Sequence, residues 1–560
     1  MISGRENRFG GLTMSDTTSR PAWTTLLPAL ALYLVLVPIG IGLQRERINP
    51  DGVCYIRLAR CLSEGRVLDS VSGHWSPLIS WCAAAPIGAG MDGQLAMRLV
   101  LAAWGLVFVA GAGLLLRRFT TLPRAWAVAC LLGAVPVALD WSLQVITPDI
   151  IVAACLMFYF RASVHPRLLE RRPAQLACGF WGGMAFLAKA YALPFVLAGL
   201  PIALLLRYWT ARRGAGATAP ADGGSPRPSL RRLVLAWATC LIMFAVVAGP
   251  WIALLSWKLG RFTFSTAGTA SHAYAGPTLR TGPGLLAPRP GELTIWEHPE
   301  EVPVPDWSPF AGSTLAMHQL RVIGRNLQTV RTYIADFDAA GISLFVLLAT
   351  PALVFLFRRR RDDLFRVLWV ASVFVIYCGG YLLMHLQERY IAPVLWPVAC
   401  LWCFHLGWRL VEHVGPMLRD RGRSERGWRV VIALILVASF GGMAAGRAAG
   451  LALYRPLRNF RNIAREIEQA GCRGPVAGTR PDETLYLAYH MNQPWLGAPA
   501  SARLAECAAE LERFGARTFI VWDSSPLAAT FDNAPGWVRV VDVDASRAGS
   551  KGAFHAYRRP

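Results

Sequence analysis

The first residues that could do chemistry lie in a short stretch near the N-terminus, residues 49–60. This stretch follows a long apolar run, residues 23–43, and begins with Asn-Pro-Asp-Gly, so Asp51 stands where the chain has just crossed a membrane. A carboxylate at this boundary is a candidate general base for a reaction on a lipid-linked substrate. The competing interpretation is that Asp51 only caps the short helix that follows, a position in which Asp is common.

Other ionisable residues occupy the ends of later apolar runs, on the same predicted side of the membrane as Asp51. Ionisable side chains at the rim of a membrane bundle are costly and are functional candidates by default. They are Arg57, His74, Asp149, Lys189, Glu388 and Arg389. Each also has an ordinary interpretation, because Asp149 could cap a helix and Lys189 or Arg389 could extend to the interface.

The composition indicates a membrane environment. The chain has 560 residues, a mean hydropathy of +0.37, 54% hydrophobic residues and only 16% charged residues, which is typical of a multi-pass membrane protein. The net charge of +22 does not indicate nucleic-acid binding, because the arginines cluster in short loops and form no basic face with interleaved aromatic residues. The expected partner is the lipid bilayer.

Apolar runs of about 17 to 25 residues predict about eleven membrane-spanning helices. They cover residues 23–43, 94–116, 124–141, 147–163, 174–189, 191–207, 233–256, 341–357, 365–384, 390–410 and 429–447. The shorter run at residues 75–90 is interrupted by prolines and predicts an interfacial or re-entrant helix.

Arginine-rich loops alternate with loops that carry few basic residues, and arginine-rich loops lie on the cytoplasmic side of a membrane. This pattern places the N-terminal tail, residues 1–22, in the cytoplasm and the loops at 44–93 and 257–340 outside the membrane. The abundance of Ala, Arg and Gly suggests a bacterial protein, for which this would be the inner membrane. Within the second outer loop, the run from Glu297 to Glu301 is interpreted as a solvated turn.

Residues 451–560 differ in composition from the transmembrane domain at 23–450 and predict a small α/β domain on the outer, periplasmic side. Helices are expected at 462–470 and 502–514, and strands at 475–477, 518–522 and 537–543. Cys472 and Cys507 both fall in this domain, where an oxidising compartment would permit a disulfide between them. A structural zinc site is not expected, because the cysteines and histidines lack the required spacing.

Several short motifs follow one another along the chain, each next to a predicted span. An Asp follows the first span, Trp-Ser-Pro-Leu begins at Trp75, Thr-Pro-Asp ends at Asp149, Leu-Ala-Lys ends at Lys189, and Glu-Arg-Tyr-Ile-Ala-Pro begins at Glu388. Over residues 20–450 this arrangement resembles GT-C glycosyltransferases, in particular the branch of the protein O-mannosyltransferases and lipid A aminoarabinose transferases. The chain departs from the branch in having Asp51-Gly52 in place of an acidic pair and Trp75-Ser76-Pro77 in place of Lys-Pro-Pro.

The resemblance implies an α-helical GT-C membrane fold and an inverting transfer of a sugar from a polyprenyl-phosphate donor to an acceptor at the outer face. It also implies that Asp51 is the catalytic residue. Lys189, Arg389 and Arg57 could hold the donor phosphate, and Asp149 could orient the acceptor or share Mg²⁺ or Mn²⁺ with Asp51. Candidate contacts to donor or acceptor are Tyr55, His74, Glu388 and Tyr390.

Two other classes of function compete with this hypothesis. A transporter or lipid-linked glycan flippase would place charges near the membrane midplane and often shows repeated halves, whereas here the charges gather at one face. A non-catalytic assembly or sensor protein would use the C-terminal domain to bind a partner. The sequence does not identify the sugar or the acceptor.

Overall fold

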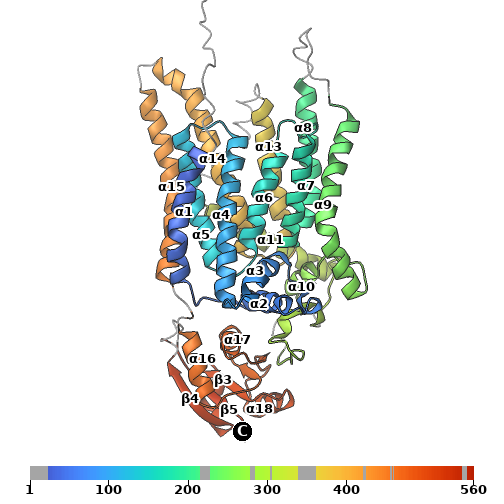
Figure 1. Cartoon of the computed structure of the whole chain (residues 1–560), viewed down its shortest axis with the longest axis vertical. Helices are drawn as coiled ribbons and strands as arrows, with labels where there is room; N and C mark the ends of the chain where they lie inside the picture. The colour runs from blue at the N-terminus through green and yellow to red at the C-terminus, as the bar shows by residue number, and fades with distance from the viewer. Residues whose placement is uncertain are drawn as a thin grey trace, which may run out of the picture.

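The computed structural model describes residues 23–214, 228–277, 284–302, 305–337, 361–420, 424–454, 457, 459–544, 546 and 552–560. In Figure 1 a tall bundle of near-parallel helices stands above a small mixed domain formed by the C-terminal residues. The N-terminal tail at 1–22 and the predicted span at 341–357 lie outside the described residues.

Eight helices of the described residues are long and apolar enough to cross a membrane. They are α1 (Trp23–Leu43), α4 (Gly93–Phe119), α5 (Arg124–Leu143), α8 (Ala192–Gly214), α9 (Leu230–Leu259), α13 (Arg361–Tyr381), α14 (Glu388–Arg419) and α15 (Glu425–Leu453). Two further predicted spans are helices of 15 and 17 residues, α6 (Asp149–Ser163) and α7 (Arg172–Ala188). These two are shorter than the roughly 20 residues that a spanning helix needs.

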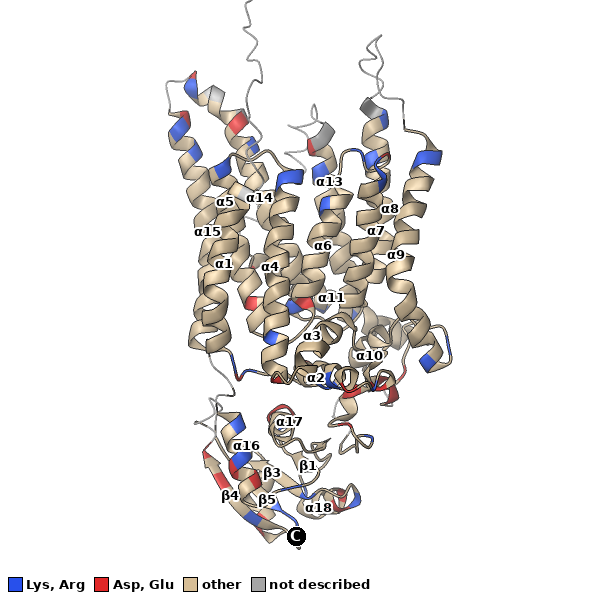
Figure 2. Cartoon of the chain, in the orientation of Figure 1, with Lys and Arg blue, Asp and Glu red and all other residues tan. Residues whose placement is uncertain are grey.

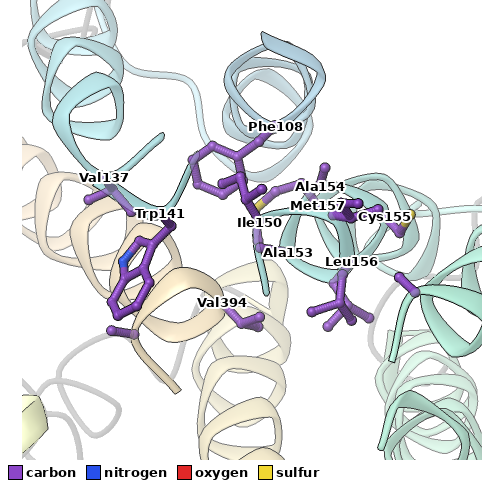
Figure 3. Close-up of a cluster of buried hydrophobic side chains, with 14 of the residues drawn as sticks. Phe108, Val137, Trp141, Ile150, Ala153, Ala154, Cys155, Leu156, Met157 and Val394 are labelled. Atoms are coloured by element: carbon purple, nitrogen blue, oxygen red, sulfur yellow. The ribbon is translucent and has the colours of Figure 1, made fainter. Parts of the chain in front are cut away.

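Helix α6 runs through the middle of the bundle. Its residues are almost all buried, as expected for a helix that is apolar on every side. Figure 3 shows Ile150, Ala153 and Met157 of α6 packed against Phe108 of α4, with Val394 of α14 nearby. Because α6 begins at Asp149, this tight packing fixes the position of the Asp149 carboxylate.

The two ends of the bundle differ in the charge of their side chains. In Figure 2, lysines and arginines gather at the upper ends of the helices, whereas most acidic residues lie at the lower end of the bundle and below it. Short helices lie across this lower end: α2 (Pro50–Ser63), α3 (Leu78–Gly88) and α10 (Ala267–Tyr274). The longer α11 (Ser313–Ala335) is amphipathic and leads back into the bundle.

The C-terminal residues form the small α/β domain that the sequence predicts. Its five-stranded sheet has the order β2-β1-β3-β5-β4, in which β1 is parallel to β2 and β3 while β5 is antiparallel to β3 and β4. The strands are β1 (Val476–Gly478), β2 (Trp495–Gly497), β3 (Thr518–Trp522), β4 (Val538–Asp544) and β5 (Ala553–Arg558), and the helices are α16 (Phe460–Gln469), α17 (Pro481–His490) and α18 (Leu504–Arg513).

The two cysteines of this domain, for which the sequence left a disulfide open, are not bonded to each other in the structure. Cys472 and Cys507 are both free thiols. Each is fully buried, but Cys472 belongs to the hydrophobic cluster that includes Ile467 and Val476, and Cys507 to a separate cluster around Phe519. The two cysteines therefore act as small apolar side chains in different parts of the core.

Candidate active site

Helix α2 carries Asp51 in its first turn, and a contact outside the helix fixes that turn. The Asn49 side chain, at the N-cap, does not cap the helix but accepts a hydrogen bond from the Ile146 backbone N–H at 2.8 Å. A Cβ added to Gly52 would lie 2.9 Å from the Ile146 Cβ. The start of α2 thus packs directly against the segment that leads into α6, which brings Asp51 and Asp149 into one site.

Asp149 and Lys189 form a buried ion pair. The Lys189 Nζ lies 2.5 Å from the Asp149 Oδ1, and the side chains are 20% and 2% exposed. The Thr147 hydroxyl donates to the other Asp149 oxygen at 2.7 Å. Burial lowers the pKa of the Lys189 ammonium, while Asp149 favours its charged form. The pair therefore presents a cation whose charge is only weakly screened by water.

Arg389 and Asp51 form the second ion pair, with 2.6 Å between Nη1 and Oδ2. Both side chains are partly open, 17% and 26% exposed, and the Arg389 Nε donates to the Gln387 side chain at 2.6 Å. The Tyr390 ring stands between the two pairs, with the Lys189 Nζ 3.9 Å and the Arg389 Cζ 5.3 Å from its centroid. The structure thus brings together Asp51, Asp149, Lys189, Arg389 and Tyr390.

A column of tyrosine rings leads from this site into the bundle. Tyr381 stacks on Tyr390 with 5.3 Å between centroids, and Tyr191 stacks on Tyr381 at 3.7 Å. The Tyr191 hydroxyl donates to the Tyr377 carbonyl at 2.6 Å. Tyr381 and Tyr377 were not identified from the sequence, because an aromatic residue inside an apolar run gives no signal of its own. Tyr191 follows directly after the Leu-Ala-Lys motif, which is a signal that was available.

Glu388 points away from the two pairs. It forms an ion pair with Arg447 of α15, which also binds Asp140 of α5 with 2.8 Å between Nη1 and Oδ2. This three-residue network joins three helices at the turn that carries Arg389. Neither Asp140 nor Arg447 was identified from the sequence, because each lies inside a predicted span.

Arg57 is also engaged away from the ion pairs. Its Nη2 donates to the Gly291 carbonyl at 2.7 Å, and its Nε lies 3.4 Å from the Glu297 carboxylate. The interpretation of Glu297 to Glu301 as a solvated turn is wrong for its carboxylates at 297 and 300. The Glu297 side chain is 1% exposed and the Glu300 side chain 4%. The Glu297 carboxylate accepts hydrogen bonds from the Leu293 and Thr294 N–H groups of the same loop. The Glu300 carboxylate accepts them from the Ser72 hydroxyl and the Gly73 N–H.

His74 and Tyr55 lie at the edge of the site, and Trp75 packs against both of them. The Trp75 ring contacts the edge of Tyr55 at 5.0 Å and of His74 at 4.6 Å between centroids. Burial lowers the pKa of His74, and the charge of Asp51 opposes this shift. Burial raises the pKa of Tyr55 well above its usual range. The His74 Nδ1 is buried and has no hydrogen-bond partner among the described residues.

Comparison with known proteins agrees with this arrangement. Residues 74–218 match the family model described as dolichyl-phosphate-mannose-protein mannosyltransferase. Two crystal structures of ArnT from Cupriavidus metallidurans, one bound to undecaprenyl phosphate and one in the apo state, each match 96% of this chain and 98% of their own. The TM-score is 0.55 for both, with 16% and 15% sequence identity respectively. A search of curated protein sequences gives no match.

The fold is the one expected from the motif order, because a likeness that covers nearly the whole of both chains includes the helical bundle and the C-terminal domain. Together with the apolar helices, it identifies a multi-pass membrane protein. The chain therefore has the GT-C fold of ArnT, and residues 74–218 within it match the mannosyltransferase family model.

Proposed function

We propose that this protein is a glycosyltransferase that moves a sugar from a polyprenyl-phosphate-linked donor to an acceptor at the outer face of a bacterial inner membrane. The observation that carries the proposal is the pair of ion pairs, Asp51–Arg389 and Asp149–Lys189, at one end of a GT-C bundle. The opposite end is rich in arginine, which supports a cytoplasmic location for that end and for the N-terminus. ArnT with undecaprenyl phosphate bound has the same fold, which supports the class of donor.

In the proposed reaction, Arg389 exchanges its partner, from the Asp51 carboxylate to the donor phosphate. The donor phosphate binds to Lys189 and Arg389, whose charges stabilise it as it becomes the leaving group. When Arg389 turns to the phosphate, the Asp51 carboxylate becomes free to accept a proton from the acceptor hydroxyl. The hydroxyl oxygen then attacks the anomeric carbon as the bond to the phosphate oxygen breaks. The products are an inverted glycoside and the polyprenyl phosphate.

We propose that these cations, and not a divalent metal, balance the charge of the phosphate. Mg²⁺ and Mn²⁺ favour carboxylate oxygens that are free to coordinate, but Asp51 and Asp149 are each already bound by a cationic side chain. No group of three potential metal-binding side chains occurs among the described residues. Transfer measured in excess EDTA should therefore equal transfer without it, and restoration of lost activity by added Mg²⁺ or Mn²⁺ would contradict this.

The function is tested with the purified protein in liposomes and a panel of radiolabelled polyprenyl-phosphate sugars. The proposal predicts that at least one donor loses its sugar to a new covalent product. A matched preparation of the Lys189→Met and Arg389→Gln double variant should show no product. Movement of the intact labelled lipid between leaflets, without any new linkage, would instead favour a flippase.

A further inference from the structure

A segment of the second outer loop, residues 284–302, connects the C-terminal domain with the helix that carries Asp51. We call it the strap. At its first end, Leu285 is 1% exposed and belongs to the hydrophobic core of the C-terminal domain. The Leu285 N–H donates to the Glu510 carboxylate at 2.9 Å and the Leu286 N–H to the Leu496 carbonyl at 2.8 Å. This end of the strap is part of the C-terminal domain in terms of packing.

The strap also covers the open edge of the sheet. Strand β2 is the outermost strand on its side, so its backbone groups have no neighbouring strand there. The Trp495 N–H of β2 donates to the Leu293 carbonyl of the strap at 2.7 Å. Together with the bond from Leu286 to Leu496, this ties the strap to β2 at successive residues. The strap therefore moves with the sheet.

The middle of the strap binds α2 through Arg57. The Arg57 guanidinium donates to the Gly291 carbonyl at 2.7 Å and lies 3.4 Å from the Glu297 carboxylate. Glu297 also accepts the Leu293 N–H at 2.7 Å, so its position depends on the fold of the strap. The side chains of Arg57 and Glu297 are only 10% and 1% exposed. Breaking a charge pair this deeply buried is costly, because it leaves a charge without a partner in the protein interior.

The far end of the strap reaches the other face of the site. The Trp75 Nε1 donates to the Trp296 carbonyl at 2.6 Å, and the Trp75 ring packs on Tyr55, one helical turn after Asp51. The Glu300 carboxylate accepts the Gly73 N–H at 2.9 Å and the Ser72 hydroxyl at 3.1 Å. Among the described residues, the hydrogen bonds from the strap to the membrane domain thus reach Arg57 of α2, Asp69 just after α2, and residues 72–75.

We propose that Arg57 and Glu297 are positioning residues through which docking of the C-terminal domain holds α2 so that Asp51 faces Arg389. The inference rests on the proposed function, in which Asp51 is the base. It assigns to the C-terminal domain an indirect part in catalysis, because the sheet holds the strap and the strap holds the helix that carries Asp51. It also explains why Arg57, although close to the site along the chain, is bound to a carboxylate and not open to a phosphate.

The test compares Glu297→Gln with a matched control in the same strap. Arg289 and Glu301 form an ion pair that is about half exposed, and the double variant Arg289→Gln/Glu301→Gln removes it without touching α2. For Glu297→Gln the inference predicts a fall in kcat of about 10-fold or more with an unchanged KM for the donor, and for the control no change in either. The charge-swapped variant Arg57→Glu/Glu297→Arg should recover part of the lost kcat.

A second readout does not depend on turnover. Hydrogen exchange of the α2 amides, residues 50–63, should accelerate in Glu297→Gln while exchange in strands β1 and β3 stays unchanged. Unchanged α2 exchange would overturn the inference, even if the wild-type protein transferred no sugar and the proposed function itself failed. An equal fall in kcat for the control variant, or a Glu297→Gln variant with full kcat, would overturn it as well.

Discussion

The two ion pairs of the site differ in how much each side chain depends on its partner. Asp149 is only 2% exposed, whereas Lys189, Arg389 and Asp51 are 20%, 17% and 26% exposed. Removing one member of a buried pair leaves an uncompensated charge and costs about 3 to 5 kcal/mol. The Asp149–Lys189 pair is therefore expected to serve both stability and phosphate binding, and the Asp51–Arg389 pair mainly reactivity.

A comparison of a single and a double variant separates these two contributions. Lys189→Met should lower the thermal midpoint and abolish transfer, because Asp149 is left without a cation and the donor phosphate without a ligand. Lys189→Met/Asp149→Asn should regain most of the thermal stability but no transfer. The two quantities are measured by thermal unfolding in detergent and by the transfer assay.

Lys258→Met provides the matched control. Lys258 is another lysine at the lower end of the bundle, where it binds the carbonyls of Leu68 and Val71 and, among the described residues, forms no ion pair with a carboxylate. Its loss should leave transfer within about 2-fold of wild type. If the Lys189→Met/Asp149→Asn variant transferred sugar at the wild-type rate, Lys189 would not be a phosphate ligand.

At the scale of elements, the approach of α2 to the segment before α6 depends on Gly52. An added methyl group would lie 2.9 Å from the Ile146 Cβ, closer than such atoms pack, so α2 has to move away. Gly52→Ala should therefore reduce kcat by at least 10-fold, measured by the same transfer assay. Gly42→Ala in α1, where the added Cβ meets nothing within 4 Å, should have no effect. Equal activity of both variants would show that the distance between α2 and α6 is not critical.

The elements themselves were largely predictable from the sequence, because a run of apolar residues long enough to span a membrane has few other structures open to it. The small domain was harder. Strands β2 and β5 and helix α17 were missed. The strand at Trp495–Gly497 has only three residues, and β5, with the sequence Ala-Phe-His-Ala-Tyr-Arg, has no β-branched residue.

Local patterns also could not reveal which charges meet. Asp51 and Arg389 are 338 residues apart in the chain, and only the packed bundle brings them together. The same limit applies to Glu297, whose charged neighbours suggested exposure although the strap buries it.

At the scale of the whole molecule, the C-terminal domain docks under the bundle through charged residues near His490. Arg461 of α16 pairs with Asp92 at the start of α4, with 2.7 Å between Nη2 and Oδ2. Burial lowers the pKa of His490 to about 4, helped by Arg461 and Arg465 and opposed by Asp92. Because the folded protein favours neutral His490, this contribution to stability is complete above pH 6.5 and is lost as the pH falls toward 4.

The wild-type protein should therefore unfold at a lower temperature as the pH falls from about 7 to 4.5, and His490→Gln should show a shallower dependence on pH. Thermal unfolding across this range measures the effect. His318→Gln serves as the control, because His318 bonds to the Ala275 carbonyl, away from the docked domain. A pH dependence in His490→Gln as steep as in the wild type would contradict the account of this interface.

The role of Asp51 as the base of the transfer reaction is tested most directly by Asp51→Asn, assayed with the donor on which the wild type is active. General-base catalysis contributes roughly 10²- to 10⁴-fold to a rate. Asp51→Asn should therefore bind the donor and unfold near the wild-type temperature, yet transfer sugar at least about 100-fold more slowly. A correctly folded Asp51→Asn protein with full transfer activity would contradict it.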